Sequence, residues 1–153
     1  MCDYSLHSIR NRLAVEGDRL KIHRFQTGSI GLAPAPDIAA EAEREANQGF
    51  WRKFFRLGPK PYQPACAVCI PPGARLLVHD IPARMQADLQ IGETEEVTFT
   101  QLTARENAYR DAFRFDNGLA VLLQHFQPGQ QVELLMLFAE EAENDPELQE
   151  IVA

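Results

Sequence analysis

Tight-turn signals between short apolar runs restrict the fold of this chain more than any other feature. They occur at Gly17-Asp18, Pro72-Gly73, Asn117-Gly118 and Pro128-Gly129. Asn-Gly favours a type I′ turn, because both central residues must tolerate a positive φ, and Pro-Gly suits the centre of a type II turn. Strands joined by such short connections are antiparallel neighbours. The sequence therefore predicts a mainly β fold.

The segments between these turns have the residue pattern of strands. Val97 and Phe99 alternate with polar residues, as a half-buried strand requires. The segment 131–138 is apolar on both faces towards its end, which predicts a central strand. Residues 82–92 fit a helical turn or a loop. The predicted strands cover 3–9, 19–25, 65–70, 75–81, 95–102, 109–115, 119–126 and 131–138, and 65–70 pairs with 75–81 in a hairpin.

One amphipathic helix, from about residue 37 to about 57, interrupts this pattern. Asp37 is placed to cap its first turn, and Gly58-Pro59 ends it. Its apolar stripe comprises Ala39, Ala42, Ala46, Phe50, Phe54 and Leu57. We expect an antiparallel β-barrel or sandwich of about eight strands, with this helix inserted. The single β-rich domain spans 1–139, and 140–153 is an acidic tail.

Composition and charge narrow the class of protein. The chain has 153 residues, 45% hydrophobic and 24% charged, as soluble globular proteins do. Six of its 22 acidic residues lie in 140–150, and the remainder nearly balance the 15 basic residues. The tail serves solubility or contacts a basic partner. No long basic stripe is present, so we expect no nucleic-acid binding.

The cysteines raise the question of redox or metal chemistry. On a strand, Cys66 and Cys69 would have Cα atoms ~10 Å apart and side chains on opposite faces. Such a pair closes no disulfide and shares no zinc ion without a sharp bend. An odd number of cysteines and an N-terminus without an apolar signal segment predict a cytoplasmic protein. The simplest interpretation of both cysteines is as small apolar side chains.

Cys2 allows two sharper hypotheses. Removal of Met1 would leave an N-terminal cysteine with a thiolate and an amine. A first strand beside the hairpin would let zinc or another transition metal bind a mixed site of Cys2, His7, Cys69 and His79. Alternatively, Cys2 is the nucleophile of an amidohydrolase-like enzyme. The chain resembles class II glutamine amidotransferases and abasic-site-binding proteins in Cys2 alone, and Asp3 stands where those families have glycine.

The end of the helix combines aromatic and basic residues. Burial of the aromatic residues against the barrel would explain one apolar stripe, but Trp51 and Phe55 widen it. A surface for a protein partner, a second subunit or an anionic membrane is the alternative. The predicted partner-binding residues are Trp51, Arg52, Phe54, Phe55 and Arg56.

Several short motifs resemble a family of small uncharacterised bacterial proteins. They are the opening MCDYSLH, Gly17-Asp18, Val68-Cys69, Pro72-Gly73 and the segment 110–123. The resemblance implies a compact β-rich body and supplies no activity. The leading functional hypothesis is a non-enzymatic cytoplasmic binding or accessory protein that contacts a partner through the helix end, with a metal or thiol site at Cys2.

Overall fold

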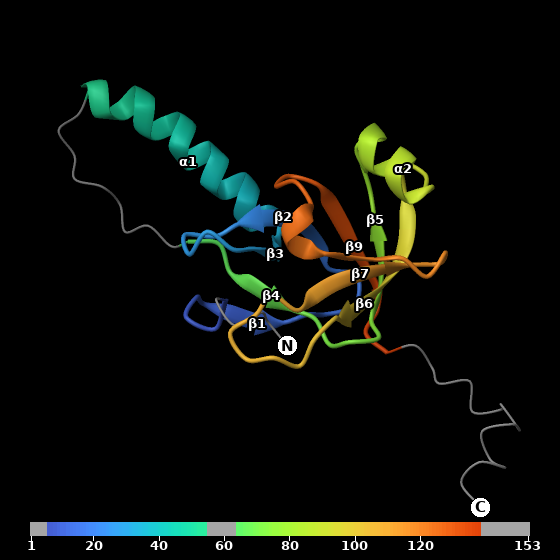
Figure 1. The fold of residues 1–153 in the computed structure, drawn as a ribbon. Helices are drawn as coiled ribbons and strands as arrows, with labels where there is room; N and C mark the ends of the chain where they lie inside the picture. Colours follow the sequence, from blue (N-terminus) through green and yellow to red (C-terminus); the bar gives the residue numbers. More distant parts are fainter. Residues whose placement is uncertain (1–5, 55–63, 139–153) are drawn as a thin grey trace, which may run out of the picture.

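Two β-sheets form the body of the protein in a computed structural model that describes residues 6–54 and 64–138, with 48–54 described by their backbone alone. The described chain contains nine strands, two α-helices and a 3-10 turn (Figure 1). The mainly β prediction is confirmed. The elements are β1 (Asn11–Leu13), β2 (Arg19–Arg24), β3 (Ile30–Pro34), α1 (Ala35–Phe54), β4 (Ala67–Cys69), β5 (Arg75–Val78), α2 (Ala83–Leu89), β6 (Glu95–Gln101), β7 (Asp111–Phe115), β8 (Ala120–Leu122), η2 (Leu123–His125) and β9 (Gln131–Met136).

The larger sheet has seven antiparallel strands in the order β3-β2-β9-β5-β6-β7-β8. The prediction of a central last strand is correct, since β9 lies between β2 and β5. The sheet curls, but its edge strands β3 and β8 do not pair, so the predicted closed barrel does not form. A side chain connects the two edges instead. The Gln124 amide on η2 accepts a hydrogen bond from Ile30 N at 3.0 Å and donates one to Ile30 O at 2.7 Å.

The predicted hairpin between 65–70 and 75–81 does not form, and its first strand belongs to the smaller sheet. Pro72-Gly73 does form a turn, with φ of 93° at Gly73 and a hydrogen bond from Ala74 N to Pro71 O. However, β4 and β5 do not pair. In the described chain β4 pairs in parallel with β1, Asn11 opposite Ala67, and β5 pairs with β6 and β9. The first predicted strand is also wrong where it is described, because residues 6–9 form a turn.

The Asn117-Gly118 prediction is correct in topology and wrong in turn type. Strands β7 and β8 are antiparallel, and Gly118 has φ of 87°. Asn117 has a negative φ, so the turn is not type I′. Its side-chain oxygen accepts a hydrogen bond from Leu119 N at 3.0 Å, and Phe115 N donates to Leu119 O. A three-residue loop with glycine in the left-handed position results.

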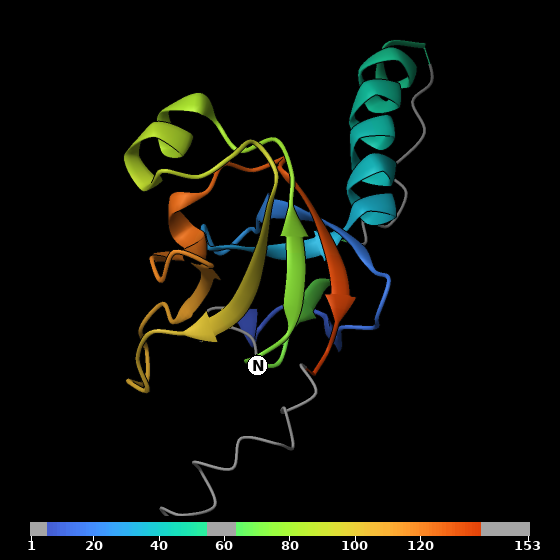
Figure 2. The same cartoon turned by 90° about the vertical axis from the view of Figure 1, so that its right-hand side faces the viewer.

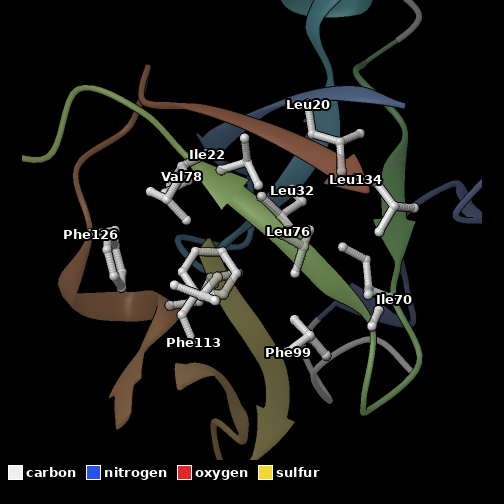
Figure 3. Close-up of a cluster of buried hydrophobic side chains, with 14 of the residues drawn as sticks. Leu20, Ile22, Leu32, Ile70, Leu76, Val78, Phe99, Phe113, Phe126 and Leu134 are labelled. Carbon is white, nitrogen blue, oxygen red and sulfur yellow. The ribbon is translucent and has the colours of Figure 1, made fainter. Parts of the chain in front are cut away.

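The main core lies inside the curl of the large sheet. Figure 3 shows its side chains from β2, β3, β5, β6, β7 and β9 converging, with Phe113 against Phe126. A second, smaller cluster joins Leu6, Phe25, Ala33, Ala65, Ala67 and Cys69, and Ile38 of α1 packs against it. Gly31 permits this second cluster, because a Cβ there would lie 2.7 Å from Leu6 Cδ1. The cluster attaches α1 to the body.

Helix α1 continues directly from β3 and projects away from both sheets (Figures 1 and 2). It begins at Ala35, so Asp37 lies in the first turn and is not the predicted N-cap. Residues 42–47 are all exposed. The helix is described to Phe54, and the predicted end at 57 lies outside the described residues. The ambiguous stretch 82–92 contains α2. None of the described helices is long and apolar enough to span a membrane.

Candidate functional site

The base of α1 is held by two carboxylates that bind the backbone before β4. Glu41 Oε1 accepts a hydrogen bond from Ala65 N at 2.7 Å, and Asp37 Oδ2 accepts one from Cys66 N at 3.3 Å. Ala65 and Cys66 come just before β4, so their amides have no strand partner and bind these carboxylates instead. Sequence reasoning assigned Asp37 to capping and gave Glu41 no role. Their spacing of one helical turn is the signal that both face the same side.

His23 of β2 extends this anchor. Its Nε2 lies 3.8 Å from Glu41 Oε2, and its ring makes an edge contact with Phe25 at 4.9 Å between centroids. Burial lowers the pKa of His23 below its usual value of 6.5, and the charge of Glu41 opposes part of that shift. Arg10 adds a longer ion pair to Asp37, at 3.9 Å. The base of α1 is therefore a polar, partly buried and pH-sensitive joint.

Beyond this joint, residues 42–47 of α1 are exposed. By contrast, the side chain of Glu41 is only 14% exposed. Three of the predicted partner-binding residues, Trp51, Arg52 and Phe54, lie on the projecting part of the helix backbone. Phe55 and Arg56 lie outside the described residues. The structure therefore places the described part of the predicted surface on an element that leaves the body.

Cys66, just before β4, and Cys69, the last residue of β4, have different states. Cys66 is free and buried, and its Sγ lies 3.6 Å from Ala67 O. Cys69 is 8% exposed and disulfide-bonded. The prediction that these two cysteines do not bond to each other is confirmed. Cys2 lies outside the described residues.

The predicted metal ligands are only partly described. His7 is exposed in the turn before β1. His79 follows β5, where its Nε2 lies 3.4 Å from Glu133 Oε2. Cys69 ends β4 and His79 follows β5. The Cys69 sulfur becomes a thiolate ligand only when the disulfide is reduced. The described residues contain no group of three or more His, Cys, Asp or Glu that could hold a metal. The four-ligand site stays a prediction because Cys2 is not described.

A second exposed feature was missed by sequence reasoning. Leu13 and Phe138 are 76% and 71% exposed, and Val15 and Met136 are also exposed. The turn before β2 and the end of β9 are adjacent, because Gly17 N donates to Leu134 O. Leu13 and Met136 end β1 and β9, whereas Val15 and Phe138 follow these strands. Only the tertiary arrangement leaves them uncovered.

Comparison with known proteins identifies no relative: no family model, curated protein or solved structure matches this chain. The resemblance to small bacterial proteins therefore stays an expectation.

Proposed function

We propose that this protein is a non-enzymatic binding or accessory protein and that α1 is the element that contacts its protein partner. The observation that carries the proposal is the exposure of residues 42–47 on a helix whose base is bound to the body through Asp37 and Glu41. A helix of 20 residues is about 30 Å long, so its outer part extends well beyond the joint.

The energetics of an isolated helix support this proposal. Most helical stability in proteins comes from packing of one face, and an unpacked helix of this length is marginal in water. Gly49 lowers the intrinsic helix propensity further. The end of α1 nevertheless carries Trp51, Arg52 and Phe54, and Trp and Arg are among the residues that contribute most to protein interfaces. A partner would supply packing for the exposed residues 42–47.

Site-specific photo-crosslinking in cells that express the full chain tests the proposal. A photoreactive residue at Ala42 or Ala46 should give a discrete adduct, because both positions are exposed on α1. The matched control is Glu106, which is exposed on the body. Adduct yield should fall when Trp51→Ala is added and should be unchanged by Arg84→Ala on α2. Equal labelling at positions 42, 46 and 106 would contradict a partner surface on α1.

A further inference from the structure

The turn between β7 and β8 contains a chemically reactive pair, Asn117-Gly118, that the proposed function does not use. It is the one Asn-Gly pair in the sequence, and both residues are exposed. In such a pair the glycine backbone nitrogen can attack the side-chain carbonyl carbon of the asparagine, because glycine has no side chain to block the approach. All other asparagines in the sequence precede larger residues.

Hydrogen bonds in the folded protein hold the groups that would react. The Asn117 side chain donates from Nδ2 to Leu89 O at 2.9 Å and accepts at Oδ1 from Leu119 N at 3.0 Å. The attacking nitrogen, Gly118 N, donates a hydrogen bond to Phe115 O at 3.0 Å. The reaction therefore requires a local opening of this turn.

The bond to Leu89 also joins the β7–β8 turn to the end of α2. Leu89 is the last residue of α2, and the last carbonyls of a helix have no partner within it. Gln90 follows in the left-handed conformation, with φ of 55°, and its amide bonds back to Gln86 O, as does that of Ile91. Asn117 supplies the donor for the Leu89 carbonyl at this helix end.

We propose that Asn117 is a site of spontaneous deamidation and that its conversion to aspartate releases the end of α2 from the β7–β8 turn. Gly118 N gives its proton to a hydroxide ion and forms a bond to Asn117 Cγ. The bond from Cγ to Nδ2 then breaks, and ammonia leaves with a proton taken from water. Water opens the resulting succinimide ring at either carbonyl, which gives aspartate or isoaspartate. The net reaction consumes water, releases ammonia and involves no oxidation or reduction.

The aspartate product keeps one contact of the original side chain and loses the other. A carboxylate oxygen can still accept from Leu119 N, but the carboxylate cannot donate to Leu89 O and places negative charge beside that carbonyl oxygen. The side chains of Met85 and Leu89 pack against the main core and hold the rest of α2. Deamidation therefore frees the end of the helix without detaching the whole helix.

Ageing of the full-length protein in mildly alkaline buffer, followed by peptide mass mapping, tests the modification. Asn117 should convert severalfold faster than Asn107, which is exposed but precedes alanine. Gln86→Ala removes the hydrogen bond from Gln86 Nε2 to Ile81 O at 2.7 Å, so it should loosen α2 and accelerate conversion of Asn117. Conversion of Asn117 no faster than that of Asn107 would overturn the site, and an unchanged rate in Gln86→Ala would overturn its coupling to α2.

Hydrogen exchange tests the release of α2. Asn117→Asp reproduces the aspartate product and should accelerate exchange at the amides of Gln90 and Ile91 by roughly fivefold or more, because the helix end loses a hydrogen bond. Asn107→Asp makes the same charge change in another exposed turn and should leave both amides at the wild-type rate. Equal exchange in the two variants would overturn the release. Circular dichroism checks that both variants keep the fold.

Discussion

At the scale of single residues, several side chains form hydrogen bonds with backbone groups that a neighbouring strand would usually bind. Glu41 and Asp37 bind backbone amides before β4, and Gln124 binds both backbone groups of Ile30. Each substitutes for a missing strand neighbour. A buried backbone group without a hydrogen-bond partner costs free energy of folding. These polar residues therefore contribute to stability, although nothing in the sequence pattern assigns them to the core.

Glu41→Ala should destabilise the protein by about 1–3 kcal/mol, because it leaves the Ala65 amide without its carboxylate acceptor. Urea unfolding measures the change, and hydrogen exchange at Ala65 should accelerate. Glu43→Ala is the matched control, since Glu43 is exposed two residues further along the helix. Equal stability of the two variants would show that the contact with Ala65 contributes nothing.

His23 should make folding stability depend on pH. Its pKa is lowered in the folded state by burial, so below pH 6.5 the unfolded chain binds the proton more readily than the folded one. The stability present above pH 6.5 should therefore fall as the pH decreases through that value. Urea midpoints at pH 7.5 and 5.5 measure this effect.

The control for that experiment uses a second histidine. His23→Gln should reduce the loss of stability between the two pH values, whereas His125→Gln should leave it unchanged because His125 is exposed. A wild-type midpoint that does not decrease on acidification would contradict the role assigned to burial at His23.

At the scale of elements, the large sheet is completed by a contact that is not a strand pair. Gln124→Glu should cost about 1–3 kcal/mol, because a carboxylate can accept from Ile30 N but cannot donate to Ile30 O. Hydrogen exchange at Ile30 and urea unfolding report the loss. Gln127→Glu makes the same change at an exposed position and should be nearly neutral. If both variants unfold at the same urea concentration, η2 does not hold the edge of β3.

At the scale of the whole molecule, the disulfide at Cys69 needs an oxidising environment, whereas the expected cytoplasmic location is reducing. Structural disulfides are rare in a reducing cytoplasm. We expect the purified chain, denatured without reductant, to be alkylated at Cys66 and not at Cys69, and to be alkylated at both after reduction. Alkylation followed by peptide mass mapping locates the labels.

Cys66→Ala is the control for this experiment and should remove the label at that position while Cys69 stays unlabelled. A labelled Cys69 before reduction would contradict the disulfide and would return Cys69 to the set of thiolates available to the predicted metal site. Metal analysis of reduced, chelator-free protein would then test Cys2, His7, Cys69 and His79 as ligands.

Local residue chemistry determined much of this fold. The turns at Gly73 and Gly118 follow from residues within a few positions of each other, as do the alternation in β6 and the existence of α1. Turn chemistry and hydrophobic period act between near neighbours, so the sequence alone displays them. The central position of β9 was predicted from its apolar residues on both faces, but only one face is buried, since Leu135 and Met136 are exposed.

Only the tertiary structure decided which segments meet. Strand β4 pairs with β1 and not with its neighbour β5, because pairing depends on packing of segments far apart in sequence. The same applies to the candidate site. The sequence identified the aromatic and basic end of α1. That the helix projects from the body, with its base bound through Asp37 and Glu41 to Cys66 and Ala65, is seen only in the tertiary structure. Those contacts are selected by the free energy of packing between distant segments, which no local sequence pattern shows.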